Sequence, residues 1–164
     1  ERCINRRRRV ECSGERCKLG GSGSNRAWAM FESCPARLEV RETNRVGNGV
    51  YSMENIASGG VVCEYLGEVI SRVEMRRRAA EGTLKYVMAY GADKFIDAEH
   101  FGNVARFCNH SCEPNCRAEE WTVEGFYRVG IVAQRNVRRG EETFSYGPWY
   151  MIDRCNCIKC YREC

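Results

Sequence analysis

Residues 102–116 read GNVARFCNHSCEPNC, a short stretch that is rich in polar and sulfur side chains. A second run, FSY, follows about thirty residues later and ends in Tyr146, and a cluster of cysteines closes the chain. We predict that these three segments meet in space and form one catalytic centre. The candidate side chains that the first stretch places within eleven residues are Arg106, Asn109, His110, Cys112 and Cys116.

The size and composition of the chain limit its class. With 164 residues, of which 43% are hydrophobic, it is long enough for one domain with its own core. No apolar run approaches the roughly 18 residues that a membrane-spanning helix needs, and no signal peptide is visible, so we expect no membrane partner. The chain begins at Glu1 instead of a methionine, and we expect it to be a fragment of a longer protein.

Much of the positive charge lies in two arginine runs, at residues 6–9 and 76–78, and the net charge is +4. Such runs favour polyanions such as DNA. They also occur on ordinary solvated surfaces, and neither run has interleaved aromatic residues that would stack on bases. The sequence leaves open a non-specific contact with DNA through these arginines.

The twelve cysteines gather at the two ends of the chain and around the central stretch. Their density would also suit a secreted disulfide scaffold. The C-terminal spacing C-x-C-x2-C-x3-C, however, puts neighbouring thiols on one tight loop, and converging sulfurs suit tetrahedral zinc better than separate disulfides. We therefore expect zinc and a reducing compartment, either cytosol or nucleus. The N-terminal cysteines that could supply one four-thiolate site are Cys3, Cys12, Cys17 and Cys34.

Short strand patterns dominate the chain from residue 38 onward, whereas residues 1–34 show little periodicity and need a metal or a neighbouring surface to fold. Ser71 is placed to cap a helix that continues to Glu81. The glycines of G-N-G at 47–49 suit either a plain hairpin turn or a close approach of a ligand to the main chain. The sequence therefore predicts a mostly β domain with one helix. Strands are expected at 38–43, 50–54, 61–70 with a break at Gly67, 85–90, 94–98, and as a hairpin over 121–133 that turns near Glu124 and Gly125.

The segment from Arg106 to Asn115 resembles the hallmark R-F-x-N-H-S-C-x-P-N of the SET-domain protein lysine methyltransferases, and it matches every fixed position. The resemblance covers roughly residues 36–164. CINRRRRVEC near the N-terminus resembles the end of the associated-with-SET module, and members of that subfamily mostly methylate the histone H3 tail at lysine 36. Further matching motifs are G-x-G at 47–49, E-Y-x-G-E-V at 64–69, W-T-V-x-G at 121–125 and T-F-x-Y at 143–146.

This resemblance implies a SET-type β fold whose C-terminal segment threads beneath a loop in a pseudoknot-like manner, with a short helical insert and zinc-bound cysteine-rich flanks. It divides the chain into a partial cysteine-rich segment (1–35), a SET catalytic domain (36–147) and a post-SET zinc-binding segment (148–164). The implied reaction is methyl transfer from S-adenosylmethionine to a histone lysine. The expected partner is a histone tail or a nucleosome, the location is nuclear chromatin, and we expect a monomer.

Residue roles follow from the same resemblance. Tyr146 is expected beside the transferred methyl group, and Tyr65 and Tyr86 are expected to line the lysine channel. Phe144 occupies the family's Phe/Tyr switch position, and because it lacks a hydroxyl we predict that di- or trimethylation is allowed. Cofactor contacts map onto Val46, Gly47, Asn48, Tyr86, Arg106, Asn109 and His110.

The resemblance also implies a zinc ion between the central stretch and the C-terminal segment. Cys112 would be one ligand, with Cys155, Cys157 and either Cys160 or Cys164, of which Cys160 is preferred on spacing. The remaining thiols, Cys63, Cys108 and Cys116, are expected to act as small apolar residues.

The chain departs from the family pattern in several places. G-W-G is replaced by G-N-G, a leucine is missing after Gly140, Ser145 stands where Asp or Asn is usual, and Gly23 stands where a zinc ligand is expected. These departures keep three alternatives open. They are an inactive SET-like reader or scaffold, a zinc-held nucleic-acid-binding module that uses the arginine runs, and a methyltransferase of a non-histone protein.

Overall fold

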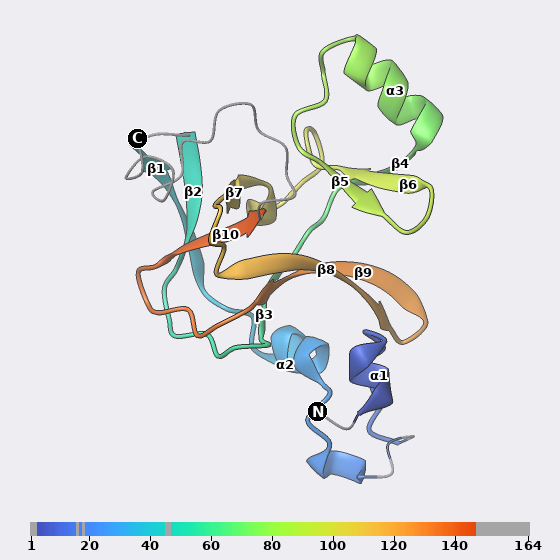
Figure 1. The fold of residues 1–164 in the computed structure, drawn as a ribbon, viewed down its shortest axis with the longest axis vertical. Helices are drawn as coiled ribbons and strands as arrows, with labels where there is room; N and C mark the ends of the chain where they lie inside the picture. The colour runs from blue at the N-terminus through green and yellow to red at the C-terminus, as the bar shows by residue number, and fades with distance from the viewer. Residues whose placement is uncertain (1–2, 16, 18, 45–46, 147–164) are drawn as a thin grey trace.

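The computed structural model describes residues 3–15, 17, 19–44 and 47–146 (Figure 1). Within them the strands form three small sheets with the orders β1-β2-β10-β7, β3-β9-β8 and β4-β6-β5. This confirms the mostly β architecture. The strands are β1 (Leu38–Thr43), β2 (Gly47–Ser52), β3 (Val61–Glu64), β4 (Glu68–Ser71), β5 (Val87–Tyr90), β6 (Lys94–Asp97), β7 (Asn109–His110), β8 (Cys116–Val123), β9 (Phe126–Ala133) and β10 (Glu142–Tyr146).

The first sheet is built around β10, which pairs antiparallel with β2 and parallel with β7. β1 is the strand that the sequence predicted at 38–43. Of the two alternatives that the sequence left open for residues 47–49, the plain hairpin turn is wrong. These residues lie inside β2, because they pair in register with 41–43 of β1. A Cβ atom at Gly49 would lie 2.8 Å from Cγ2 of Thr43 and would displace the Glu142 carboxylate from its place beside β2.

The second sheet contains the hairpin that the sequence predicted. β8 and β9 pair antiparallel from Cys116 with Ala133 to Val123 with Phe126. The two turn residues, Glu124 and Gly125, both have positive φ (51° and 90°), as a two-residue turn of type I′ requires. β3 adds to this sheet along β9.

The third sheet carries the helical insert, α3 (Arg72–Ala80). Ser71 caps it as expected, because its Oγ accepts a hydrogen bond from the N–H of Glu74. The single run expected at 61–70 is instead two strands in different sheets. The break falls at Gly67, where a Cβ atom would lie 2.5 Å from the carbonyl oxygen of Asp97, so only glycine allows this close approach.

Two helices near the N-terminus, α1 (Ile4–Arg7) and α2 (Ala27–Ser33), were not predicted. α2 places Trp28 in full burial against Val61, Trp121 and Val132. We expected residues 1–34 to need either a metal or a neighbouring surface in order to fold. The burial of Trp28 shows that a neighbouring hydrophobic surface supports α2. Two short 3-10 helices, η1 (Gly20–Ser22) and η2 (Val104–Phe107), complete the described elements.

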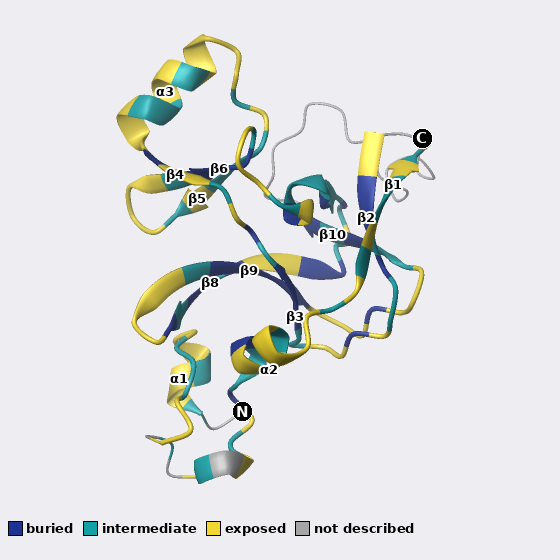
Figure 2. Ribbon diagram, turned by 180° about the vertical axis from the view of Figure 1, so that it is seen from behind, coloured by how far each residue is buried: buried dark blue, intermediate teal, exposed yellow. Residues whose placement is uncertain are grey.

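The main core receives side chains from all three sheets, for example Val50 of β2, Ile131 of β9 and Ile96 of β6. Figure 2 shows the buried residues concentrated in β2, β3, β8 and β9, whereas α3 is largely exposed. The three thiols expected to behave as apolar residues, Cys63, Cys108 and Cys116, are all buried. None of the helices in the described part of the chain has the length and apolar character to span a membrane. The predicted threading of the C-terminal segment involves residues beyond 146 and lies outside the described residues.

Candidate active site

The pairing of β10 with β7 joins two of the three segments that the sequence predicted to meet. Phe144 is in register with Asn109, and Tyr146 is in register with His110. The segment from Phe144 to Tyr146 therefore lies beside Asn109 and His110 (Figure 1). The third segment, with Cys155, Cys157, Cys160 and Cys164, lies outside the described residues.

Asn115 fastens this junction. Its side chain is fully buried, and its Nδ2 donates hydrogen bonds to the carbonyl of Glu142 (2.7 Å) and to Oε1 of Glu141 (3.0 Å). Its Oδ1 accepts from the N–H of Phe144 (2.9 Å). One amide thus satisfies two main-chain groups of β10 and the carboxylate of Glu141, the residue just before this strand. From the sequence, Asn115 was recognised only as part of the motif, and this positioning role was not predicted.

Two of the predicted cofactor residues, Asn48 and Asn109, lie together. Nδ2 of Asn109 donates to the main-chain carbonyl of Asn48 and to Oε1 of Glu142, both at 2.9 Å. Glu142 also accepts from the Tyr51 hydroxyl at 3.3 Å, and the pKa of Tyr51 is raised by burial and by this neighbouring carboxylate. Glu142 therefore ties three strands together, a role that the sequence analysis missed. Gly47 and Asn48 are exposed at the end of β2.

The remaining predicted cofactor residues behave differently from one another. Val46 lies outside the described residues. His110 is half-buried, and its Nε2 lies 3.6 Å from the sulfur of Cys112. Arg106 holds the main chain, because its Nη1 donates to the carbonyls of Ala98 (2.9 Å) and Glu99 (3.0 Å).

The two tyrosines expected to line a channel are in direct contact. Tyr65 is 1% exposed, and its hydroxyl donates to the carbonyl of Tyr86 at 3.0 Å. The Tyr86 ring packs edge-on against Phe107, with 6.0 Å between ring centroids. The guanidinium of Arg106 lies over both rings, 5.5 Å from that of Tyr86 and 4.7 Å from that of Phe107. Such contacts fix the rings by cation–π attraction.

The side chains of β10 alternate in burial. Thr143 and Ser145 are buried and Phe144 between them is half-buried. Thr143 is fully satisfied, because its hydroxyl donates to the carbonyl of Val50 (3.1 Å) and lies 3.6 Å from the sulfur of Cys108. The hydroxyl of Ser145 has no hydrogen-bond partner among the described residues. Of Tyr146 only the strand position is described.

The N-terminal thiols are partly assembled. Cys12 lies beside Cys3 and Cys17, and its sulfur accepts from the amides of Asn25 (3.2 Å) and Asn5 (3.4 Å). These amides, and then the two thiols, lower the pKa of Cys12. Cys34 is exposed, just after α2. Among residues 3–146, apart from the undescribed positions, no three His, Cys, Asp or Glu side chains are arranged to hold a metal ion, so zinc stays a prediction.

Comparison with known proteins agrees with this architecture. A family model described as "SET domain" matches residues 47–147. The chain is 39% identical over 172 residues to the "Histone-lysine N-methyltransferase, H3 lysine-36 specific" of Debaryomyces hansenii, covering 96% of the chain and 23% of the relative. It is 40% identical over 152 residues to the "Histone-lysine N-methyltransferase SETD2" of Homo sapiens, covering 89% of the chain and 6% of the relative.

A third relative is the "Variant-silencing SET domain-containing protein" of Plasmodium falciparum, 33% identical over 169 residues, with 95% of the chain and 7% of the relative covered. The chain thus spans a quarter or less of the curated relatives it matches. The family match itself extends over most of the chain, from β2 to just past β10. The chain belongs to the SET domain family.

Proposed function

We propose that the chain is an S-adenosylmethionine-dependent protein lysine methyltransferase that acts on the tail of histone H3 at lysine 36. The observation that carries this proposal is the pairing of β10 with β7, because it brings the segment of Tyr146 beside Asn109 and His110. The printed names of the fungal and human relatives support the substrate. The same proposal includes a histone tail or nucleosome as partner, a location in nuclear chromatin and a monomeric state. It also divides the chain into segments that end at residues 35 and 147.

The chemistry requires a neutral lysine amine, because a protonated amine has no lone pair for attack. Free lysine has a pKa of about 10.4, and an apolar channel lowers it by disfavouring the ammonium form. We assign the channel walls to Tyr65 and Tyr86. In support, the hydroxyl of Tyr65 is already hydrogen-bonded to the Tyr86 carbonyl, so this polar group is satisfied within the protein.

S-adenosylmethionine, when bound, supplies the electrophilic methyl group. We propose that Tyr146 orients the lysine amine toward that methyl group, and that Phe144 leaves room for di- and trimethylated products. The main chain at 46–48, with the side chains of Tyr86, Asn109 and His110, would hold the cofactor. In support, Gly47 and Asn48 are exposed beside Asn109, which offers polar groups suited to an amino-acid moiety. Because Arg106 already binds two carbonyls, we assign it a positioning role.

We also propose a zinc ion held by Cys112, Cys155, Cys157 and either Cys160 or Cys164, and a second one at the N-terminal thiols. In support of the second, Cys12 already lies beside Cys3 and Cys17, and its lowered pKa favours the thiolate that zinc requires. Metal analysis tests both sites independently of activity. Cys112→Ser and Cys12→Ser should each lower the zinc content by about one equivalent. A full zinc complement in either variant rejects the corresponding site.

Mass spectrometry of nucleosomes and free histone H3 after incubation with S-adenosylmethionine tests the reaction. We expect methylation at lysine 36, and we expect Tyr146→Phe to lower its rate at least about a hundredfold. Tyr127→Phe is the matched control, because Tyr127 is exposed on β9, and it should retain full activity. Methylation at another lysine would reject the substrate assignment. Binding of the H3 tail without any transfer would instead support a reader or scaffold.

A further inference from the structure

The carboxylate of Glu142 lies beside the main chain that is proposed to hold the cofactor. Glu142 begins β10 and pairs in register with Tyr51 of β2, so the two side chains lie on the same face of the first sheet. Gly49, two residues before Tyr51, faces the same side, and a Cβ atom there would displace the carboxylate. The glycine therefore lets Glu142 approach the main chain of β2 next to Asn48, which is exposed.

Two hydrogen-bond acceptors lie within reach of one nitrogen at this place. Nδ2 of Asn109 donates to Oε1 of Glu142 and to the carbonyl of Asn48, and both distances are 2.9 Å. A nitrogen of a ligand can therefore reach the same two acceptors. Oε2 of Glu142 accepts from the Tyr51 hydroxyl at the longer distance of 3.3 Å. Because a carboxylate has about four lone pairs for hydrogen bonds, Glu142 keeps acceptor capacity that these two donors do not use.

The charge of Glu142 is treated differently from that of its neighbours. Among the described residues, no arginine, lysine or histidine forms an ion pair with Glu142, whereas the adjacent Glu141 pairs with Arg135 at 2.5 Å. Arg41, which faces the same side of the sheet as Glu142, pairs with Glu39 at 2.9 Å. Glu142 is half-buried, and a carboxylate that is partly removed from water is stabilised by a nearby cation. This carboxylate is therefore suited to a cationic ligand.

We propose that the carboxylate of Glu142 binds the α-ammonium group of S-adenosylmethionine. This inference rests on the proposed function, which places the cofactor at the main chain of 46–48 and at Asn109. An ammonium group brings a positive charge and three N–H donors, enough for Glu142 and the carbonyl of Asn48 together. Hydrogen bonds between two charged groups are about twice as strong as neutral ones. The sulfonium of the same cofactor has no N–H donor, so the hydrogen-bonding capacity of Glu142 favours the ammonium group.

The place of this carboxylate follows from a departure of the chain from the family pattern. The leucine expected between Gly140 and Thr143 is missing, so Glu142 directly precedes Thr143. Since Thr143 is fully buried, the alternation of β10 places the preceding side chain on the opposite face, toward Asn109. Asn48 stands where the family pattern has a tryptophan, and an ionic contact from Glu142 supplies binding energy in place of that aromatic side chain. The inference is therefore specific to this chain.

Isothermal titration calorimetry of the full chain with three ligands tests the proposal without any methyl transfer. S-adenosylmethionine carries both the ammonium and the sulfonium group, S-adenosylhomocysteine carries only the ammonium group, and methylthioadenosine carries neither. We expect Glu142→Gln to weaken binding of the first two ligands about tenfold and to leave the third unchanged. Glutamine keeps an oxygen that accepts from Asn109 and Tyr51, so the temperature of thermal unfolding should stay close to that of the wild type.

Two control variants separate the charge of Glu142 from other effects. Glu42→Gln removes the same charge from an exposed residue of β1, and because Glu42 is in register with Asn48 its side chain lies on the face opposite to Glu142. Tyr51→Phe removes the hydroxyl contact of Glu142 and keeps the charge. Both variants should bind all three ligands as the wild type does.

The outcomes distinguish this proposal from the proposed function. An equal loss for S-adenosylmethionine and S-adenosylhomocysteine in Glu142→Gln alone supports it. A loss for S-adenosylmethionine only overturns it, because the sulfonium would then be the group that is recognised. It is also overturned by a loss for methylthioadenosine, by an equal loss in either control variant, or by unchanged affinity in Glu142→Gln, and the proposed function survives each of these results. A chain that binds the cofactor through Glu142 but methylates no substrate rejects the enzyme and keeps the contact, whereas a wild-type chain that binds none of the ligands rejects both.

Discussion

The side-chain oxygen Oδ1 of Asn115 accepts a hydrogen bond from the main-chain N–H of Phe144, with 2.9 Å between the two atoms. The nitrogen of the same amide donates to the carbonyl of Glu142 on the other side of Thr143. Asn115 therefore fixes the strand that leads to Tyr146 from a position 31 residues earlier in the chain. Because the amide is fully buried, water cannot replace these hydrogen bonds.

Replacing Asn115 with Ala should destabilise the fold by about 3 kcal/mol, because it removes the three hydrogen bonds of a fully buried amide and leaves two main-chain groups of β10 without this partner. Urea denaturation followed by circular dichroism measures this free energy. Asn136→Ala is a suitable control, since Asn136 is exposed and its side chain accepts one hydrogen bond, from the N–H of Ser58. A loss below about 1 kcal/mol in Asn115→Ala would contradict the role assigned to this amide.

Glu141 should make stability depend on pH. Burial acts to raise its pKa, but hydrogen bonds from Arg135, the N–H of Arg138 and Asn115 outweigh burial and lower the pKa to about 2. A depressed carboxyl pKa stabilises the fold above the ordinary value of 4.5, and this stabilisation is lost as the pH falls toward 2. Glu141→Gln should be less stable at pH 7, and the difference from wild type should shrink below about pH 4.5. A difference that is constant with pH would argue against this assignment.

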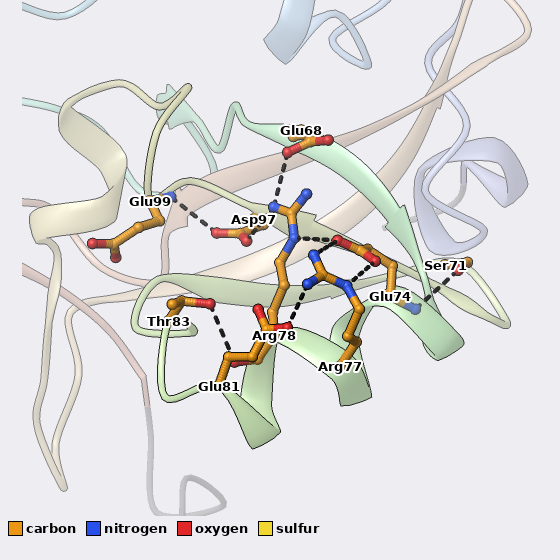
Figure 3. Close-up of polar contacts among 9 residues, drawn as sticks. All are labelled: Glu68, Ser71, Glu74, Arg77, Arg78, Glu81, Thr83, Asp97 and Glu99. Carbon is orange, nitrogen blue, oxygen red and sulfur yellow. Dashed lines mark hydrogen bonds and ion pairs between the residues drawn. The ribbon is translucent and has the colours of Figure 1, made fainter.

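Arg78 should contribute far more to stability than its neighbour Arg76. Its guanidinium pairs at 2.7 Å with the carboxylate of Asp97, which is 2% exposed, and so connects α3 to β6 (Figure 3). Arg78→Ala leaves this buried charge unpaired and should cost about 3 kcal/mol. Arg76→Ala removes an exposed arginine of the same helix and should change stability by less than about 0.5 kcal/mol. Thermal unfolding of the two variants, side by side, gives the comparison, and equal effects would count against it.

Phe144→Tyr should shift the products toward monomethyl lysine. The added hydroxyl takes up space beside the acceptor amine and offers it a hydrogen bond, so a second methyl group fits less well. The ratio of mono- to di- and trimethylated peptide at saturating cofactor, read by mass spectrometry, measures the change. An unaltered product ratio with retained activity would show that Phe144 does not limit the room at the acceptor.

The core thiols should resist alkylation in the native state. Burial raises the pKa of Cys116 to about 12, so its reactive thiolate is scarce at pH 8. Exposed Cys34 should react with iodoacetamide at that pH, as peptide mapping would reveal, while Cys63, Cys108 and Cys116 do not, because all three are buried away from the reagent. The raised pKa also means that Cys116 stabilises the fold fully below pH 9 and loses this contribution as the pH rises toward 12. Rapid native labelling of Cys116 would refute the prediction.

The features that were predictable from sequence are those that depend on local signals. The conformational preferences of a few adjacent residues determine three such features, namely the cap at Ser71, the turn at Glu124 and Gly125, and the strand at 38–43. The meeting of Phe144 and Tyr146 with Asn109 and His110 was predictable because both segments match motifs of the same family. Single residues of the motif could be recognised, but their contacts could not.

The predictions that were wrong or missing concern segments whose structure depends on contacts between residues far apart in the sequence. Gly47 to Gly49 look like a turn, yet pairing with β1 makes them part of a strand. α2 has only seven residues, too few for a stable helix by itself, and it forms because Trp28 fits into a hydrophobic surface contributed by β3, β8 and β9. Glu142 connects Asn109 and Tyr51 through contacts that span 33 and 91 positions, and no sequence pattern announces them.

Trp28 also bears on how this domain can be cut for experiments. Its ring rests on Gly130 of β9, where a Cβ atom would lie 2.9 Å away, and Arg128 covers it with 4.3 Å between the guanidinium carbon and the ring centroid. A fragment that starts at residue 36 would leave Val61, Trp121 and Val132 without their cover. Such a fragment should self-associate, so any shortened form of the domain used for crystallisation or inhibitor screening needs to retain α2.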